Sequence, residues 1–327
     1  MSAEGYPLSD HFDGDRFFNP GGARSPGLPS VLRWKLTSKR AGWPSWIEDP
    51  RVPAPAPIQE GELAATFVGH ATWLLRLGGV TVLTDPIWSE RCSPFSFAGP
   101  KRVRRPGLAF ETLPRVDATL VSHGHYDHLD LPTLQRLSEL HRCEFVTPLG
   151  HEALCARHAI QSVHALDWWQ TWEGPRDLRV TLVPSRHFSA RSLIDRNRAL
   201  WGGFVLERGG RRVYFAGDTG YGNHFAAIRE RLGPLDLALL PIGAYDPRWI
   251  MQRVHMDPDE AIQAWRDIAQ ASSSAEPPAF IPIHWGTFKL TDETMDEPPR
   301  RLTTQWQRAQ LPLGALRVLT HGETFAL

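Results

Sequence analysis

Four side chains able to hold a metal ion stand within six residues of one another in the run TLVSHGHYDHLD, which covers residues 119–130. The run begins apolar, as a buried strand does, and ends in the pattern His-x-His-x-Asp-His. Buried imidazole and carboxylate groups each need a partner. Because neutral imidazole and carboxylate suit Zn²⁺ and similar divalent ions, we interpret the run as part of a metal site. A surface histidine cluster at a strand end is the alternative.

The spacing within this run divides the four side chains between two ions. His123 and His125 stand two apart on an extended segment, so both can converge on one ion, whereas Asp127 and His128 can reach a second. Three more residues of ligand type each follow an apolar run: His187, Asp218 and His284. Strands that end on one side of a sheet would bring all seven side chains into a single cleft.

Short apolar runs bounded by turns predict the strands that carry these residues. They lie at residues 63–68, 72–77, 80–86, 118–123, 144–148, 178–184, 201–207, 211–217, 235–241 and 279–284. Helical stretches between them lie at 131–142, 150–158, 224–232 and 257–269. Pro132 and Pro258 suit a first helical turn, and we expect Asp130 and Asp257 to cap the helices that follow them.

Residues 1–60 differ from the rest because they are rich in Gly and Pro and show little periodicity. We expect an irregular N-terminal arm around the core with one short helix within residues 31–46, followed by one domain over residues 61–327. Tryptophan alternates with basic residues in the segment 31–46, which suits a membrane interface. An aromatic latch that packs the arm onto the core is the other interpretation.

The composition argues against several classes of protein. Basic and acidic side chains number 36 each among 327 residues, so no net charge recruits a nucleic acid. No apolar run approaches the ~18 residues of a membrane-spanning helix, and the N-terminus lacks the pattern of a secretory signal. Three cysteines without CxxC spacing argue against a disulfide scaffold. We therefore expect a cytoplasmic protein, with peripheral contact to the inner face of a membrane left open.

The motif HGHYDH resembles the HxHxDH signature of the metallo-β-lactamase superfamily, and the three later ligands follow in the order that signature requires. Longer blocks resemble one family within it, the N-acyl-phosphatidylethanolamine-hydrolysing phospholipases D. Among them are LTDPIWS (83–89), GPKRVRR (99–105), AGDTGY (216–221), PIGAYDPRW (241–249), HMDPDEA (255–261) and IHWGTF (283–288). The resemblance runs from Phe18 to Pro299. It departs from the family at Gly124, where Asn is usual, and at Arg186, where Gln is frequent, and both positions bear on substrate preference.

The resemblance implies a four-layer αββα sandwich, with two mixed sheets face to face, helices outside and the metals at one edge. It assigns His123, His125 and His187 to a first zinc ion, Asp127, His128 and His284 to a second, and Asp218 to a bridge. Other divalent transition metals remain open. The catalytic residues it implies are Asp127, Asp218 and, near the substrate phosphate, His255.

The implied reaction is zinc-dependent hydrolysis of a phospholipid phosphodiester, in which an activated water attacks phosphorus. The products are a phosphatidic acid and an N-acylethanolamine. The alternative is a soluble enzyme with the same metals that hydrolyses a lactone, a thioester or a small phosphodiester. A non-catalytic membrane-associated module fits the complete ligand set less well. The acyl-chain preference and the oligomeric state, with a homodimer as one option, are left open.

Three features near the ligands have two interpretations each. Asp85 either accepts an imidazole N–H and so fixes a ligand, or simply forms an Asp-Pro turn. His70 either belongs to the core, which we favour, or approaches the metals. The basic run at residues 101–105 either meets phospholipid headgroups or is merely solvated.

Overall fold

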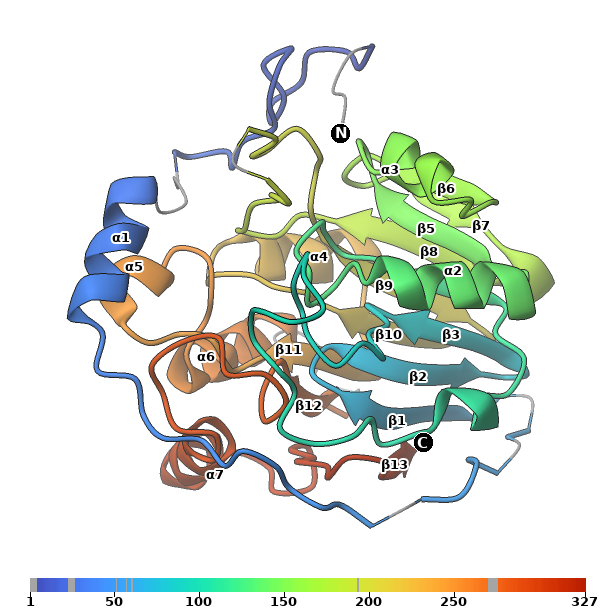
Figure 1. The fold of residues 1–327 in the computed structure, drawn as a ribbon. Helices are drawn as coiled ribbons and strands as arrows, with labels where there is room; N and C mark the ends of the chain where they lie inside the picture. The colour runs from blue at the N-terminus through green and yellow to red at the C-terminus, as the bar shows by residue number, and fades with distance from the viewer. Residues whose placement is uncertain are drawn as a thin grey trace.

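Two β-sheets lie face to face at the centre of the computed structural model, which describes residues 5–22, 27–50, 52–56, 58–59, 61–192, 194–269 and 276–327 (Figure 1). Within these residues the first sheet has the order β13 (Thr324–Ala326), β1 (Leu63–Gly69), β2 (Thr72–Leu77), β3 (Val80–Thr84), β4 (Ala118–Leu120), β5 (Glu144–Pro148) and β6 (Val163–Leu166). The second has the order β12 (Ala279–Ile283), β11 (Leu237–Pro241), β10 (Arg211–Phe215), β9 (Gly203–Arg208), β8 (Arg179–Val183) and β7 (Thr171–Glu173). Both sheets mix parallel and antiparallel pairs.

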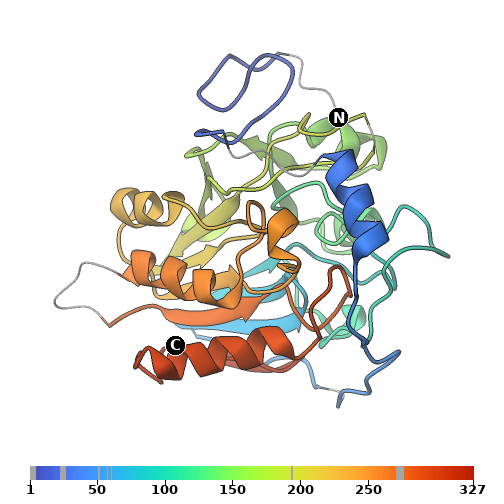
Figure 2. The ribbon, with the colours of Figure 1, turned by 90° about the vertical axis from the view of Figure 1, so that its left-hand side faces the viewer.

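Apolar side chains of both sheets meet between them, for example Leu75 and Val82 from the first sheet with Leu182 and Phe204 from the second. The outer face of the first sheet packs on α2 (Leu131–Leu140) and α3 (Glu152–Arg157). The outer face of the second packs on α4 (His224–Leu232), α6 (Pro258–Ala269) and α7 (Glu297–Arg308). Because helices cover the outer faces, strands such as β3 and β11 are buried along their whole length. The order helix, sheet, sheet, helix confirms the expected αββα sandwich (Figure 2).

The predicted strands and helices all appear, with ends that differ by a few residues. The sequence pattern gave no signal for β6, β7 and β13, which have three or four residues each and lie at sheet edges. So few residues leave no alternation to detect. It also gave no signal for α5 (Arg248–Met251) and α7, and prolines are the second and third residues of α7.

The two expected helix caps have different outcomes. Asp257 is confirmed, because its Oδ1 accepts the backbone N–H of Glu260 at 2.9 Å. The prediction for Asp130 is wrong. Its carboxylate lies at the N-cap position but makes no side-chain cap, and accepts hydrogen bonds from Ser89 and from the hydroxyl of Thr133 instead.

The N-terminal arm runs over the outside of the sandwich before it enters β1 (Figure 1). It contains α1 (Leu28–Thr37) and is otherwise irregular within the described residues. Phe12 and Phe17 are buried in the core between the sheets, and the indole N–H of Trp34 donates to Asp292 at 3.0 Å. Among the described residues, no helix combines the length and apolar character needed to cross a membrane.

Candidate metal centre

The seven predicted ligands lie together at one edge of the two sheets. They follow four strands: His123, His125, Asp127 and His128 after β4, His187 after β8, Asp218 after β10, and His284 after β12. β10 and β12 both run parallel to β11, and β8 shares their direction because β8 and β10 both pair antiparallel with β9. A backbone hydrogen bond from Gly202 N to Ser122 O, 3.0 Å long, joins the end of β4 to this edge.

The first group of ligands consists of three imidazoles whose nitrogens face one another. Nε2 of His123 is 2.7 Å from Nδ1 of His125, which is 3.2 Å from Nε2 of His187. The other nitrogen of His187 donates its N–H to the carbonyl of Val254 at 2.9 Å. This bond leaves the Nε2 lone pair of His187 free for a metal. Bonds of ~2.0–2.1 Å to a tetrahedral ion require donor atoms spaced at about this distance.

The second group combines imidazoles and carboxylates around Asp218. The Oδ2 atom of Asp218 is 3.2 Å from Nε2 of His128, and its Oδ1 atom is 3.2 Å from Nε2 of His284. Both imidazole nitrogens lie 3.4 Å from Oδ2 of Asp127. Oδ2 of Asp218 also lies 3.9 Å from Nε2 of His187, in the first group. Asp218 therefore stands between the two groups, where a bridging ligand must lie.

The two groups differ in charge. Burial lowers the pKa of His125 to about 3 and that of His187 to about 4, so these imidazoles are neutral at neutral pH. In the second group burial also opposes the charged imidazole, but Asp218 and Asp127 outweigh it and raise the pKa of His284 to about 9. Burial would raise the pKa of Asp218, yet His284 and His128 hold it well below its usual range.

This donor set fits divalent cations. Nε2 of His128 and Oδ1 of Asp218 are buried and have no hydrogen-bond partner among the described residues. A buried polar atom without a partner costs free energy, and a cation between such donors would remove that cost. Imidazoles with one or two carboxylates are the donors that Zn²⁺ and related ions take in proteins. These side chains would therefore hold the metals.

Asp85 bonds His128 at Nδ1, the ring nitrogen that does not face the other ligands. Its Oδ2 atom accepts the Nδ1–H of His128 and the hydroxyl of Ser122, both at 2.6 Å, and its Oδ1 atom accepts the backbone N–H of Ser122 at 2.6 Å. The prediction that Asp85 accepts an imidazole N–H is confirmed. With Nδ1 occupied, His128 presents Nε2 to a metal.

Two more histidines lie beside the ligands. Nε2 of His70 is 3.0 Å from Oδ2 of Asp127, and its ring centroid is 4.0 Å from that of His284. The favoured interpretation of His70 as a core residue alone is therefore wrong, because the ring is buried and also contacts a ligand. Nδ1 of His255 is 3.8 Å from Oδ2 of Asp218. This places His255 at the predicted site, while its contact with a phosphate stays a prediction.

The backbone around the second group is strained. His70, Asp85 and His284 have φ angles of 58°, 36° and 63°, a left-handed region that is costly for residues other than glycine. A hydrogen bond of 2.9 Å from the N–H of His284 to the carbonyl of His70 joins two of them. The residue types of these positions do not predict positive φ angles, because the strain depends on contacts between segments.

The two departures from the family pattern have structural explanations. A Cβ atom on Gly124 would meet Oγ of Ser189 at 2.7 Å and Cε1 of His151 at 3.0 Å, so neighbouring side chains fill the space that a larger residue needs. Arg186 donates from its guanidinium to the carbonyl of Tyr221, which is not one of the ligands. Sequence reasoning missed Ser189 and His151, which carry no motif of their own.

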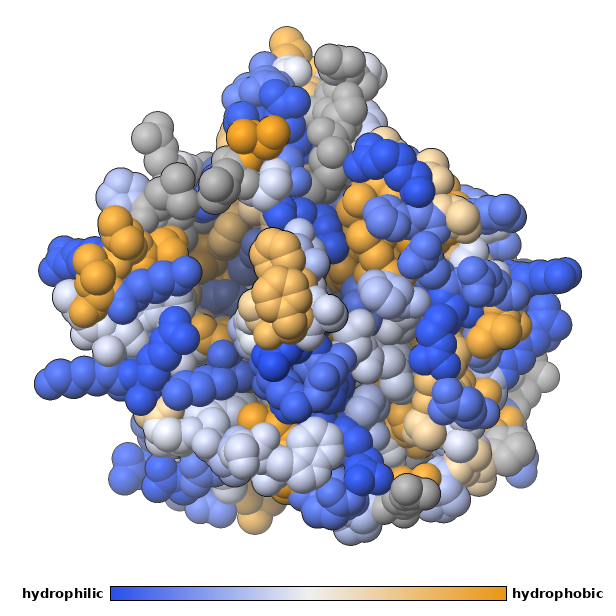
Figure 3. Space-filling model, viewed as in Figure 1, coloured by the Kyte–Doolittle hydropathy of each residue, from blue (hydrophilic) through white to orange (hydrophobic). Residues whose placement is uncertain are grey.

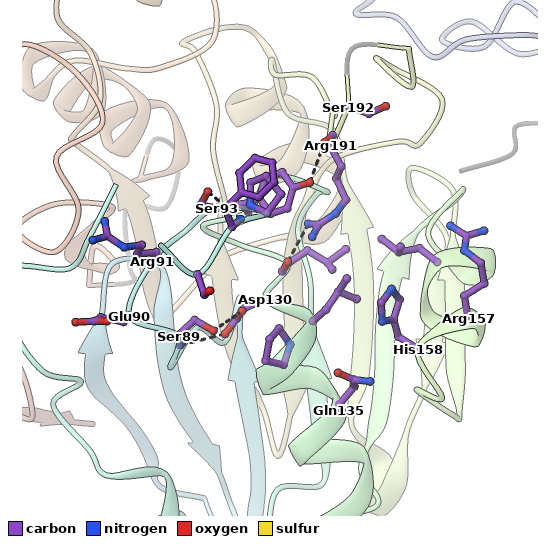
Figure 4. Close-up of a pocket in the computed structure, with 18 of the residues that line it drawn as sticks. Ser89, Glu90, Arg91, Ser93, Asp130, Gln135, Arg157, His158, Arg191 and Ser192 are labelled. Carbon is purple, nitrogen blue, oxygen red and sulfur yellow. Dashed lines mark hydrogen bonds between the residues drawn. The ribbon is translucent and has the colours of Figure 1, made fainter. Parts of the chain in front are cut away.

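A cavity of about 690 Å³ lies beside the ligand-bearing loop after β4 (Figure 4). Tyr126, between two ligands in the chain, lines it together with Leu129 and the exposed Phe95. Arg191 lies over the ring of Tyr126 and donates to the carbonyls of Gly124 and Leu129. None of the seven ligands lines this cavity, so it adjoins the metal centre without containing it.

The basic run at residues 101–105 is partly buried and paired within the protein, and its contact with phospholipid headgroups stays a prediction. Arg102 is only 4% exposed and donates to the carbonyls of Ser89 and Ile87. Lys101 pairs with Glu90 at 2.6 Å. Arg104 and Arg105 also pair with carboxylates, those of Asp49 and Glu48.

Comparison with known proteins gives consistent matches. Residues 80–285 match the model of a "Beta-lactamase superfamily domain". An uncharacterized Mycobacterium tuberculosis protein is 40% identical over 280 residues, which cover 83% of this chain and 72% of that protein. N-acyl-phosphatidylethanolamine-hydrolyzing phospholipase D 1 of Caenorhabditis elegans is 36% identical over 312 residues, 89% of this chain and 85% of the relative. The solved structure of Igni18, a metallo hydrolase from Ignicoccus hospitalis, superposes with a TM-score of 0.60 at 21% identity, over 81% of this chain and 98% of that one.

Proposed function

This chain belongs to the metallo-β-lactamase superfamily and is a metal-dependent hydrolase, and from that premise we propose that it is a phosphodiesterase of the phospholipase D type. The proposed substrate is N-acyl-phosphatidylethanolamine or a related phospholipid, and two zinc ions are the proposed metals. The observation that carries the metal-dependent part is the position of Asp218 between two groups of ligands. The phospholipase part is supported by the nematode relative, whose similarity extends well beyond the ligands.

The chain's own residues prepare the site for this reaction. When bound, two divalent ions supply positive charge that offsets the negative charge developing on a phosphoryl group. Asp85 and the carbonyl of Val254 hold His128 and His187 in the tautomers that ligate. Burial lowers the pKa of His255 well below its usual range, so its imidazole is neutral and can donate one N–H to a phosphoryl oxygen.

We propose that the enzyme meets its substrate at a membrane surface. Phe95 lines the cavity beside the ligand loop, and the ring centroid of Phe97, which is 80% exposed, lies 5.6 Å from that of Phe95. Ile194, also 80% exposed, stands in the chain between Ser192 and Asp195, which line the same cavity. Leu36, on α1, is 77% exposed, and Figure 3 shows apolar surface over this helix. Apolar side chains that protrude in this way can enter the headgroup region of a bilayer.

The test is hydrolysis by metal-quantified protein on N-acyl-phosphatidylethanolamine vesicles, phosphatidylcholine vesicles and a lactone panel. We expect N-acylethanolamine and phosphatidic acid from the first substrate, and cosedimentation of the protein with vesicles. Fully zinc-loaded protein that cleaves a lactone or thioester and no phospholipid would overturn the proposal in favour of the soluble hydrolase.

A further inference from the structure

A second cavity, of about 440 Å³, lies between the N-terminal arm and the domain that carries the metal centre. Its walls come from the arm, from the segment after β6, from the end of β8 and from the start of α4. None of the seven metal ligands lines it. Its volume is within the range of small-molecule sites, ~300–1,000 Å³.

One polar group of this cavity lacks a partner. Ser185 is 3% exposed and lines the cavity, and its hydroxyl oxygen has no hydrogen-bond partner among the described residues. A buried hydroxyl without a partner costs free energy. A ligand with a hydrogen-bond acceptor would remove that cost.

The polar end of the cavity carries the positive charge of Arg186, which is next to Ser185 and lines it. Asn223 and His224 at the start of α4 line it too, and burial lowers the pKa of His224 to about 3, so this imidazole is neutral. This helix has no side-chain cap at Asn223 and no acidic residue in its first turn, so its first N–H groups are available to an anion. Asp10 is the one carboxylate among the lining residues, and its Oδ1 atom is 2.6 Å from Nδ1 of His11. Burial opposes the charged form of His11, but hydrogen bonds to Asp167 and Asp10 raise the pKa of this imidazole.

The other walls are flat and apolar. Trp168 and Trp169 line the cavity together with Pro20, Pro184 and Ala227. The ring of Trp168 is already stacked on His11, with centroids 4.3 Å apart. Tryptophan faces and prolines offer an apolar surface on which a planar aromatic ligand can stack.

We propose that this cavity binds an aromatic monocarboxylate. The carboxylate lies at the start of α4, within reach of Ser185 and Arg186, and the ring lies against the two tryptophans. The arm forms one wall, and Asn19 donates its side-chain N–H to the carbonyl of the ligand His187 at 2.9 Å. The occupant therefore clamps the arm onto the strand end that carries this ligand. Binding does not depend on which substrate the metal centre hydrolyses.

The test is isothermal titration calorimetry on the full zinc-loaded chain with indole-3-acetate and with its neutral analogue indole-3-ethanol. We expect the acid to bind at least about tenfold more tightly than the alcohol, because only the acid pairs with the positive end of the cavity. Equal affinities, or no binding of the acid at millimolar concentration, would overturn the proposal.

Three substitutions, two on α4 and one at its N-cap, locate the bound acid. Ala227→Met fills the cavity and should abolish binding, whereas Ala226→Met, exposed on the same helix, should leave it unchanged. Asn223→Asp, at an exposed lining position, should weaken binding about tenfold by charge repulsion, and it tests the proposal even if Ala227→Met does not fold. If these lining variants bind the acid normally, and excess inorganic phosphate displaces it, the acid binds at the metal centre and the proposal is wrong.

Discussion

The metal centre and the N-terminal arm are held in place in different ways. The metal ligands follow buried strands, and further contacts fix their rings, as Asp85 does for His128. The first part of the arm, residues 5–22, contains no helix or sheet strand. It is held by two buried aromatic residues, Phe12 and Phe17, and by side-chain contacts such as that of His11 with Asp167.

This difference predicts different responses to mutation. At the metal centre many contacts determine the position of each ligand, so losing one side chain should remove chemistry and leave the fold intact. In the arm, contacts between single side chains and the domain, such as those of Tyr6 with Glu152 and of Asn19 with the carbonyl of His187, hold a segment that has no helix or sheet strand of its own. Losing one of them should loosen the arm and leave the chemistry largely unchanged.

The largest effect should come from His284→Ala, with Asp127→Ala as a parallel case. Each removes a donor of the second group, so zinc content should fall from about two ions to about one per chain, and hydrolysis should fall below detection. The circular dichroism spectrum should not change. The matched control is His164→Ala, which removes a partly exposed imidazole on the edge strand β6 that is not one of the ligands. An active His284→Ala variant would refute the assignment.

Asp85→Asn should have a smaller effect at the same centre. The amide keeps the shape of the carboxylate but presents an N–H where His128 and Ser122 now donate. We expect a loss of roughly 10- to 100-fold in zinc affinity, measured by competition with a chelator. If zinc affinity stays at the wild-type value, the orientation of His128 does not depend on this carboxylate.

Gly124→Asn tests how tightly the centre is packed. Its Cβ would contact Ser189 and His151, so we expect a loss of about 1–3 kcal/mol in the free energy of unfolding, measured with denaturant. Adding Ser189→Ala removes the nearest atom and should recover part of this loss, compared with Ser189→Ala alone. If the Gly124→Asn protein is as stable as the wild type, the neighbouring side chains can move to accommodate a larger residue.

The smallest effect concerns the arm and depends on pH. Burial opposes the charged form of His11, but hydrogen bonds to Asp167 and Asp10 raise its pKa above the ordinary value of 6.5. A raised folded-state pKa means that the protonated form stabilises the arm. This contribution is fully present below pH 6.5 and is lost as pH rises through the folded-state pKa.

Hydrogen exchange of residues 5–22 should therefore be faster in His11→Ala than in the wild type, and this difference should be larger at about pH 6 than at about pH 9. Zinc content should be unchanged in both proteins at each pH. A difference between the variants that does not depend on pH would mean that stacking on Trp168, rather than charge, holds the arm.

Much of the fold and the candidate ligands could be predicted from the sequence. The central strands β3 and β11 are apolar along their length because helices cover their outer faces. The ligands follow β4, β8, β10 and β12, whose apolar residues mark these strands in the sequence. The short edge strands, such as β6 and β13, could not be predicted, since three or four residues carry no readable period. Nor could the role of Asp130, since an aspartate before a helix looks the same whether it caps the helix or bonds a distant loop.

The amino-acid sequence by itself determined which residue types end which strands, and so which atoms were available to a metal. Only the tertiary structure decided that Asp218 lies between the two groups, that His70 contacts Asp127, and that Ser189 fills the space beside Gly124. The physical reason is that the burial of a strand shows in the residue types of that strand alone, so it can be read within one short segment. Distances between side chains from different strands depend on how the two sheets are stacked, and no single segment encodes that arrangement.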